Sequence, residues 1–406
     1  MSHYYRYIIL GAGPSGLTMA HALIARGIPQ DSILVLEKES VAGGLCRSVT
    51  VDGSPLDIGG GHFLDERRKD VTDFLFRFMP AHEWQVFDRI AKIRIAGVEV
   101  DHPLEANLWQ LSKEDQLDFL ESITRAGCVR GDPMPEAFDE WVLWKFGECI
   151  SERYMLPYNR KIWSLPLSEL GTYWLHKLPD VSVRESLQSC LDSRAHGRLP
   201  AHGRFLYPRS HGYGEVWRRM GEALGEGLVT SCPISRIDLD ARCVNGRWYG
   251  DTIINTIPWS VWLHGCDMPE DVRKAIRGLR HASIDVDYVD TDPGSNAHWI
   301  YDPDERLPYH RLLLRNNFCA GARGYWTETN SSRSVATSGW RHHNEYGYPI
   351  NTIGKQALLE TIHAWASSRG VFPVGRWGRW EHMNSDIAVA EALQAADKIT
   401  RPEPVS

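Results

Sequence analysis

The stretch YIILGAGPSG at residues 7–16 is followed by a helical pattern and then by ILVL at residues 33–36. This order predicts a strand, a glycine-rich turn, a helix and a second strand, which is the βαβ opening of a Rossmann-like dinucleotide-binding domain. Gly11 permits the tight turn, Gly13 lets the backbone approach a diphosphate, and Gly16 permits close packing of helix on strand. The diphosphate then lies at a helix N-terminus, where free N–H groups and the helix dipole favour negative charge.

The second predicted strand ends at Glu37, whose carboxylate can accept hydrogen bonds from both hydroxyls of a ribose. The continuation AGGLCRS at residues 42–48 resembles the extended motif of the amine-oxidase-like FAD superfamily. In that motif the backbone lies against the cofactor diphosphate, and an arginine such as Arg47 can reach it. DIGGGH at residues 57–62 follows, and in that superfamily this stretch faces the isoalloxazine ring. The resemblance therefore implies FAD as the cofactor.

A second part of the predicted cofactor site lies near the carboxyl end. GRWG at residues 375–378 leads to NSD at residues 384–386 and a predicted helix. Asn, Ser and Asp are good N-caps, and a helix N-terminus beside the flavin pyrimidine would favour its anionic reduced form. We expect non-covalent FAD, because no cysteine or histidine is obviously placed for attachment. The predicted cofactor-binding residues are Gly11, Gly13, Ser15, Gly16, Glu37, Lys38, Gly44, Arg47, Gly60, Gly61, Arg376, Asn384 and Ser385.

Composition narrows the class of protein. Of the 406 residues, 43% are apolar and 24% are charged, as in ordinary soluble globular proteins. The net charge of −7 gives no basic field, so we expect neither nucleic acid nor a membrane surface as a partner. No apolar stretch is long enough to span a bilayer, and no leader pattern precedes the first strand. The eight scattered cysteines indicate reduced thiols in a cytoplasmic protein, without a metal site.

Changes of hydrophobic periodicity predict an α/β fold with three regions. The Rossmann-like FAD-binding domain is expected to be discontinuous, with segments at residues 1–70, 200–265 and 355–406. Amphipathic helical patterns predict an inserted helical cap at residues 70–200. Strand-like alternation predicts a mixed β-sheet domain that faces the substrate at residues 266–355.

Several segments outside the cofactor site resemble UDP-galactopyranose mutases, and the eukaryotic-type branch of that family more than the bacterial branch. The segments occur in the order expected of the family and span nearly the whole chain. They are HPLEANL at 102–108, EWV at 140–142, MLPYNRKIWSLP at 155–166, WIY at 299–301, PYHR at 308–311, YGYP at 346–349 and GRWGRW at 375–380.

The resemblance implies that reduced FAD is the active form and that no net redox change occurs. Flavin N5 would attack the anomeric carbon of a nucleotide sugar, displace the nucleoside diphosphate and allow pyranose–furanose interconversion, as in polysaccharide or glycoconjugate biosynthesis. It gives catalytic roles to His62, over the flavin, and to Arg311, whose guanidinium would grip the diphosphate. Removal of Arg311 is then expected to leave folding and FAD binding intact. The implied substrate-binding residues are Lys177, Asn159, Trp163, Tyr301, Tyr348, His382, His102 and Glu105.

The chain departs from the family pattern at several of these positions. Lys177 stands near the place of a second diphosphate-binding arginine, and His382 stands where a tyrosine is expected. In the segment that contacts the base, tyrosine and glutamine are replaced by His102 and Glu105. A glutamine side chain both donates and accepts hydrogen bonds, whereas an ionised glutamate only accepts them. The sequence therefore does not determine which base and which sugar the substrate contains.

Two other functions fit parts of the sequence. A flavin oxidase or dehydrogenase of the amine-oxidase type would share the first sixty residues and the terminal helix, but an amine or polyene substrate needs no diphosphate clamp. A flavin-binding protein without catalytic activity would explain the altered family positions. For the mutase, the expected partners are a nucleotide sugar and a reductant such as NAD(P)H or a flavin reductase. The sequence leaves the oligomeric state open.

Overall fold

Strand β1 (His3–Leu10) lies near the middle of the first of two seven-stranded sheets in the computed structural model, which describes residues 3–175, 180–197 and 203–400. The strand order of this sheet is β10-β2-β1-β13-β12-β11, and β19 also pairs with β13. Strands β10, β2, β1, β13 and β19 run parallel, whereas β11 and β12 are antiparallel additions. The other strands are β2 (Ile33–Leu36), β10 (Leu228–Val229), β11 (Ile237–Asp238), β12 (Cys243–Val244), β13 (Trp248–Asn255) and β19 (Val371–Pro373).

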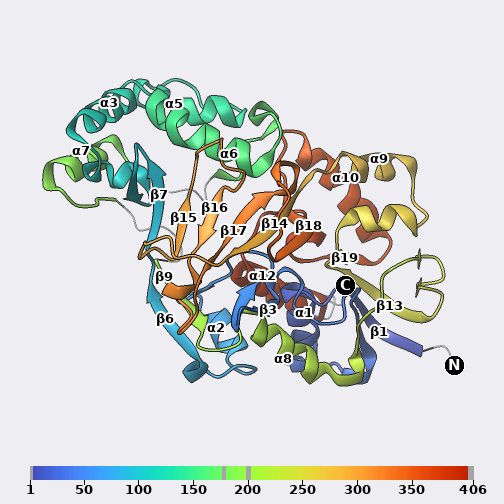
Figure 1. Cartoon of the computed structure of the whole chain (residues 1–406). Coiled ribbons are helices and arrows are strands. Elements are labelled where there is room, and N and C mark those ends of the chain that lie inside the picture. Colours follow the sequence, from blue (N-terminus) through green and yellow to red (C-terminus); the bar gives the residue numbers. More distant parts are fainter. Residues whose placement is uncertain (1–2, 176–179, 198–202, 401–406) are drawn as a thin grey trace.

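The predicted βαβ opening is present. Residues 7–10 of β1 are buried and pair in register with residues 33–36 of β2, because both segments are continuous apolar runs suited to a sheet covered on both faces. Helix α1 (Pro14–Ala25) joins the two strands and packs against α12 (Ser385–Thr400). The amino-terminal and carboxyl-terminal parts of the chain therefore form one domain (Figure 1).

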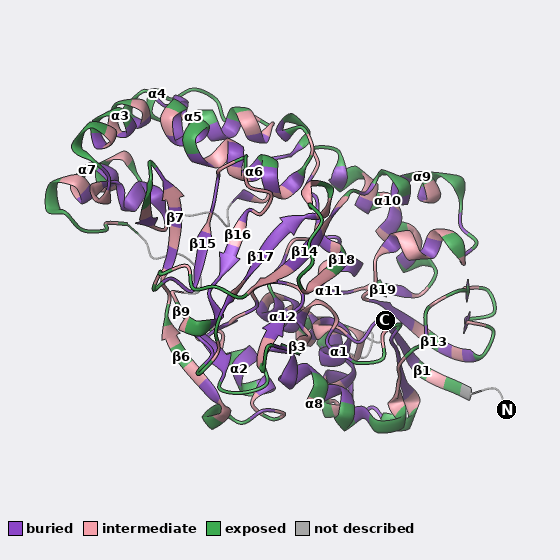
Figure 2. Cartoon of the chain, in the orientation of Figure 1, coloured by how far each residue is buried: buried purple, intermediate pink, exposed green. Residues whose placement is uncertain are grey.

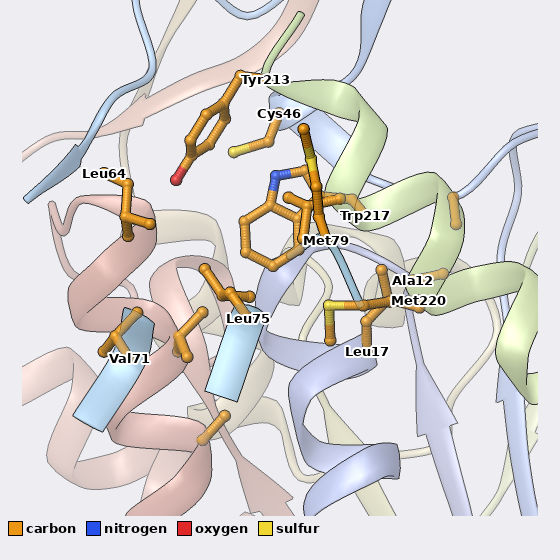
Figure 3. Close-up of a cluster of buried hydrophobic side chains, with 14 of the residues drawn as sticks. Ala12, Leu17, Cys46, Leu64, Val71, Leu75, Met79, Tyr213, Trp217 and Met220 are labelled. Atoms are coloured by element: carbon orange, nitrogen blue, oxygen red, sulfur yellow. The ribbon is translucent and has the colours of Figure 1, made fainter. Parts of the chain in front are cut away.

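A cluster of buried side chains fastens α8 (Gly214–Leu224) to this domain. Trp217 and Met220 of α8 lie beside Ala12 of the glycine turn and Leu17 of α1 (Figure 3). Trp217 is fully buried, and truncation of such a tryptophan to alanine typically costs about 3–5 kcal/mol of folding stability. The packing of α8 therefore fixes the position of the glycine turn.

The second sheet has the order β18-β14-β17-β16-β15-β7-β8. Its strands are antiparallel except for the parallel pair β15–β7, and β17 is almost entirely buried (Figure 2). The strands are β7 (Ala91–Ile95), β8 (Val98–Asp101), β14 (His281–Val289), β15 (Trp299–Tyr301), β16 (Arg311–Leu313), β17 (Tyr325–Asn330) and β18 (Arg341–Pro349). Two smaller sheets pair β3 (Ser48–Val51) with β4 (Ser54–Asp57), and β9 (Arg204–Pro208) with both β5 (Leu64–Asp65) and β6 (Trp84–Asp88).

Helices α3 to α7 form a layer along one side of this sheet, with α7 beside β7 and α6 next to β17 (Figure 1). Their buried faces share one apolar core with residues of β7 and β8, which fixes the layer to the sheet. These helices are α3 (Lys113–Thr124), α4 (Gly127–Arg130), α5 (Phe138–Ile150), α6 (Leu156–Trp163) and α7 (Val183–Asp192), with a π-helical turn at Ser151–Met155 between α5 and α6.

The secondary structure or packing of two segments differs from that of the predicted region in which each lies, and the domain boundaries themselves remain predictions. Residues 84–101, within the predicted helical cap, form β6, β7 and β8, and two of these strands complete the second sheet. Helix α9 (Glu270–Gly278), within the predicted sheet domain, packs instead against α10 (Lys355–Ser368) and the core of the first sheet. The remaining helices are α2 (Lys69–Leu75) and α11 (Gly375–Gly378).

All eight cysteines are free. In the described ranges, no helix is long and apolar enough to cross a membrane, and no group of three or more His, Cys, Asp or Glu residues is arranged to hold a metal ion.

Candidate functional site

A cavity of about 340 Å³ opens at the carboxyl ends of β1 and β2. Ligands of α/β sheets bind at this position, outside the ends of the parallel strands. Ten of the predicted cofactor-binding residues line it, namely Gly11, Gly13, Ser15, Glu37, Lys38, Gly44, Arg47, Arg376, Asn384 and Ser385. We call it the dinucleotide cavity.

The three glycines of the turn differ in what surrounds them. Gly11 has a φ of +97°, in the region that favours glycine. A Cβ atom on Gly16 would lie 1.9 Å from the carbonyl oxygen of Gly11, so Gly16 is required for the packing of α1 on the turn and does not line the cavity. A Cβ atom on Gly13 would meet only the Cα of Gly44, at 3.9 Å. The space next to Gly13 is therefore open to a ligand.

Glu37 is buried at the end of β2, where its carboxylate is fixed by the backbone. The N–H of Ala12 donates to Oε2 at 2.7 Å, and the N–H of Glu39 donates to Oε1 at 2.9 Å. Each carboxylate oxygen keeps a second lone pair, which can accept a hydrogen bond from a ribose hydroxyl. The geometry therefore fits the ribose-binding role that the sequence predicts.

Arg47 and Lys38 stand at the rim of the same cavity. Arg47 donates from Nε to the carbonyl oxygen of Gly44 at 3.0 Å, and its Nη1 lies 3.3 Å from Oε2 of Glu39. These contacts stiffen the loop that carries Gly44. The side chain of Lys38 is 60% exposed and lies 3.7 Å from Glu39, so it contributes charge at the entrance.

A second cavity, of about 390 Å³, lies between the second sheet and the helical layer. It shares four wall residues with the dinucleotide cavity, namely His62, Arg376, Asn384 and Ser385. We call it the substrate cavity. A dinucleotide whose reactive ring reached these four residues would be exposed to both spaces.

His62 is neutral at physiological pH. Its side chain is buried, and burial together with the nearby charge of Arg376 lowers its pKa to about 4. Nδ1 lies 3.1 Å from the carbonyl oxygen of Gly60, which can only accept, so the proton is on Nδ1. Nε2 is therefore left with a lone pair that can accept a hydrogen bond.

Arg376 brings a cation to the shared wall. It donates from Nε and Nη2 to the carbonyl oxygen of Met383, at 3.0 and 2.7 Å, and from Nη1 to that of Gly347 at 3.0 Å. Burial lowers its pKa. Next to it, Ser385 begins α12, and its hydroxyl lies 2.8 Å from the hydroxyl of Tyr213. The wall thus combines a guanidinium with the N-terminus of a 16-residue helix, and both favour an anionic group.

Arg311 projects from β16 into the substrate cavity, where Glu328 of β17 holds it. Nε and Nη2 both donate to Oε2 of Glu328, at 2.9 and 2.5 Å, and Nη2 lies 3.4 Å from the hydroxyl of Tyr348. Burial opposes the charge on Arg311, but Glu328 outweighs this and raises the pKa of the guanidinium. The two N–H groups of Nη1 are not used in these bonds and can donate to an anion in the cavity.

Glu328 is fully buried and ionised. Burial favours the neutral acid, but Arg311, His310 and the N–H of Gly61 together lower its pKa to about 2. Its Oε1 accepts the N–H of Gly61 at 2.8 Å. A Cβ atom on Gly60 would lie 2.2 Å from this same oxygen, which explains why glycine stands at this position. Gly60 was predicted to bind the cofactor, but it lines neither cavity.

Aromatic hydroxyls surround Arg311. The hydroxyl of Tyr301 accepts a hydrogen bond from Nε1 of Trp299 at 3.0 Å, and the ring of Tyr158 lies 5.5 Å from the ring of Tyr301. Burial and the charge of Glu328 raise the pKa of Tyr348 to about 12, so this hydroxyl keeps its proton and can donate it to a ligand.

Asn159, Trp163 and His382 form another part of the wall. The indole N–H of Trp163 donates to Oδ1 of Asn159 at 3.0 Å, and Nδ2 of Asn159 donates to the carbonyl oxygen of Met155 at 2.8 Å. The ring of His382 lies 6.1 Å from that of Trp163 and 5.0 Å from that of Tyr348. Asn159 therefore orients the indole, and one of its amide N–H groups remains for a ligand.

His102 and Glu105 lie at the end of the cavity under the helical layer. Nδ1 of His102 accepts from Nη2 of Arg89 at 3.1 Å, and burial and Arg89 lower the pKa of His102 well below its ordinary value. This neutral ring therefore carries its proton on Nε2. Glu105 is 8% exposed, and burial raises its pKa to about 7.

The structure brings nearly all of the predicted substrate-binding residues into one cavity. Its wall contains His62, Arg311, Asn159, Trp163, Tyr301, Tyr348, His382, His102 and Glu105. The predicted Lys177 lies outside the described residues. The binding roles of all these residues remain predictions.

Two charged residues of the site were missed in the sequence, namely Arg89 in the cavity wall and Glu328 behind Arg311. Glu328 stands in YWTETN, where it shares a strand face with Trp326 and Asn330, and an acid on a buried strand face implies a cationic partner. That pattern could have found it. Arg89 lies in the short link between β6 and β7, with its guanidinium 4.9 Å from the ring centre of Trp299, and nothing local distinguishes it from a surface arginine.

A family model for the NAD(P)-binding Rossmann-like domain matches residues 9–78. Over the whole chain, the structure superposes on that of reduced UDP-galactopyranose mutase with a TM-score of 0.87, covering 97% of this chain and 93% of that chain at 24% sequence identity. The chain has the fold of UDP-galactopyranose mutase. The fold predicted from the sequence is thereby confirmed.

The chain is also similar to two oxidoreductases, to one in structure and to the other in sequence. A putrescine oxidase structure aligns with a TM-score of 0.63 at 13% identity, covering 98% of both chains. Hydroxyneurosporene desaturase of Rubrivivax gelatinosus is 42% identical over 128 residues. That match covers 32% of this chain and 21% of the desaturase. The matched part is therefore about a fifth of the length of this curated relative.

Proposed function

We propose that the chain is an FAD-dependent nucleotide-sugar mutase that interconverts pyranose and furanose rings without net redox change. The observation that carries this proposal is the position of Arg311, whose guanidinium stands in the wall of a cavity that adjoins the dinucleotide cavity. An anion in the substrate cavity would meet the free N–H groups of Nη1 while its sugar reached the shared wall. An amine or polyene substrate has no group that needs this cation.

FAD fits the dinucleotide cavity on three counts. The open space at Gly13 accommodates a diphosphate, the two oxygens of Glu37 accommodate a ribose, and Arg376 with the N-terminus of α12 accommodates the anionic pyrimidine end of a reduced flavin. When bound and reduced, FAD would supply the nucleophilic nitrogen N5. We expect it to be held non-covalently.

The residues of the chain would position the substrate and stabilise charge. Arg311 would neutralise the departing diphosphate, and the hydroxyls of Tyr301 and Tyr348 would donate to its oxygens. His62, with its proton held on Nδ1 by Gly60, would offer Nε2 as an acceptor beside the reacting atoms. Glu328 would keep Arg311 and the Gly61 loop in fixed relation.

The experiment is to incubate the dithionite-reduced, FAD-loaded protein anaerobically with a panel of nucleotide sugars and to separate the products by chromatography. A new isomer of unchanged mass, formed only after reduction, supports the mutase. Conversion only under oxygen, with formation of hydrogen peroxide, supports the alternative, an oxidase of the amine-oxidase type. Retained FAD without any conversion supports a non-catalytic flavin-binding protein. NAD(P)H in place of dithionite tests the expected physiological reductant.

A further inference from the structure

The residues that line the substrate cavity differ from one part of the cavity to another. At the shared wall it is lined by His62 and Arg376, and Arg311 and Tyr301 follow. The ring of His102 lies 5.2 Å from that of Tyr301, and beyond it the cavity ends in a recess beneath the helical layer. Glu105 and Tyr154 line this recess, and Phe138, Phe146 and Trp174 are further aromatic residues of the cavity wall.

The proposed function determines which part of a ligand reaches this recess, and the inference rests on it. In a nucleotide sugar the diphosphate lies between the sugar and the nucleoside. With the sugar at the shared wall and the diphosphate at Arg311, the base extends toward His102 and Glu105. Aromatic side chains there offer flat surfaces against which a base can stack.

Glu105 is a polar group of the recess whose hydrogen-bonding capacity is left largely unused by the protein. Its side chain is more than nine-tenths buried and lines the cavity, and no other side chain of the described residues is hydrogen-bonded to it. Lys145, whose charge partly offsets the effect of burial on the pKa of Glu105, is engaged in an ion pair with Asp180. Among the described residues, only the backbone N–H of Glu105 itself donates to this carboxylate, so its burial stays costly, and a ligand that supplies further donors reduces this cost.

The four common bases differ in what they offer a carboxylate. Guanine presents two adjacent donors, N1–H and the amino group at C2, which match the two oxygens of one carboxylate. Uracil presents a single N–H between two carbonyl oxygens, and an ionised carboxylate repels both oxygens. Adenine and cytosine present an amino group next to a ring nitrogen that accepts. Only guanine therefore satisfies both oxygens without repulsion.

His102 supplies the third complementary group. Because Nδ1 accepts from Arg89, the proton of the neutral ring is on Nε2, which can donate. One donor from His102 and two acceptors from Glu105 correspond in kind to the acceptor O6 and the two donors of guanine. We propose that the recess reads a guanine base, so that the substrate class is a GDP-sugar, with Glu105 as the residue that determines base specificity.

The test is to measure dissociation constants of GDP, UDP, CDP and ADP for the FAD-loaded protein by titration calorimetry at pH 8. Glu105 is mostly ionised at this pH, since its pKa is about 7. We expect GDP to bind at least tenfold more tightly than UDP, as sites that pair with a specific hydrogen-bonding edge discriminate strongly. Glu105→Gln is expected to reduce this ratio to threefold or less. The control Glu114→Gln, at an exposed position on α3, is expected to leave it unchanged.

The outcomes separate this inference from the proposed function. UDP, CDP or ADP binding as tightly as GDP overturns the assignment of guanine while leaving the diphosphate site intact. A GDP preference that Glu105→Gln does not alter overturns the role of Glu105. If none of the four nucleotides binds to protein that retains FAD, the diphosphate site is absent and the proposed function fails as well. Flavin content and thermal unfolding of each variant verify that it is folded.

Discussion

Nε of Arg311 donates to Oε2 of Glu328 at 2.9 Å, and this carboxylate has no exposure to solvent. The other oxygen of Glu328 accepts the N–H of Gly61 at 2.8 Å. One carboxylate therefore positions both the cation of the substrate cavity and the glycine loop that leads to His62.

This pair changes what is expected of Arg311 variants. The sequence suggested that Arg311→Ala would leave folding intact, but the variant strands a buried carboxylate, which typically costs about 3–5 kcal/mol of stability. The double variant Arg311→Ala/Glu328→Gln avoids that cost. We expect it to retain FAD and lose turnover of the nucleotide sugar by about 10²–10³-fold, whereas Arg311→Lys recovers part of the activity. Flavin content and turnover are measured together, and full activity in the double variant would contradict the role of Arg311.

Gly60 is expected to be irreplaceable for a steric reason. It has a φ of +88°, and a Cβ atom there would lie 2.2 Å from Oε1 of Glu328. Gly60→Ala should therefore destabilise the protein by more than about 2 kcal/mol and displace Glu328. Gly53→Ala is the matched control, since Gly53 has a φ of +71° but no atom near its Cβ position, so only the backbone cost of about 1 kcal/mol applies. Urea unfolding measures both, and equal losses would refute the steric explanation.

The glycine turn offers a test of the cofactor site that separates binding from folding. Gly13→Ala places a methyl group in open space, so the apoprotein should unfold at the same temperature as the native apoprotein while FAD binding falls by at least tenfold. Gly16→Ala would put Cβ 1.9 Å from the oxygen of Gly11 and should prevent correct folding. Fluorescence titration with FAD and thermal unfolding distinguish the two. Undiminished FAD affinity in Gly13→Ala would exclude a diphosphate at this turn.

Glu105 should make stability depend on pH. Burial raises its pKa from the usual 4.5 to about 7, so the folded state holds a proton that the unfolded state releases between these values. Stability is then lost as pH rises from about 4.5 to 7, by roughly 3 kcal/mol in all. Glu105→Gln should match the native protein near pH 4.5 and exceed it at pH 8. Parallel unfolding curves of the two proteins across this range would contradict the assignment.

Non-covalent attachment can be tested directly. Cys46 and His62 line the dinucleotide cavity, but burial raises the pKa of the Cys46 thiol, so it stays protonated and unreactive, and His62 is held by Gly60. Acid precipitation should therefore release yellow flavin into the supernatant. Flavin that remains in the pellet would show a covalent bond.

The glycine turn and the carboxylate beside it were predictable because their signals are local. Gly11, Gly13 and Glu37 lie within one βαβ unit, so their spacing alone specifies the turn and the carboxylate beside it. Strands β7 and β8 were missed because they are short and precede a long stretch of strong helical periodicity. The hydrogen bond from Gly61 to Glu328 spans 267 residues, and no local pattern carries such a distance.

The four residues that the two cavities share have a thermodynamic consequence. A bound cofactor would become the floor of the substrate cavity, and a bound nucleotide sugar would in turn cover the cofactor. The two binding free energies are then linked, and linkage is reciprocal: the factor by which the cofactor improves the affinity for the sugar nucleotide equals the factor by which the sugar nucleotide improves the affinity for the cofactor. Bound substrate would thus slow the loss of flavin from the protein, and depletion of substrate would weaken flavin binding.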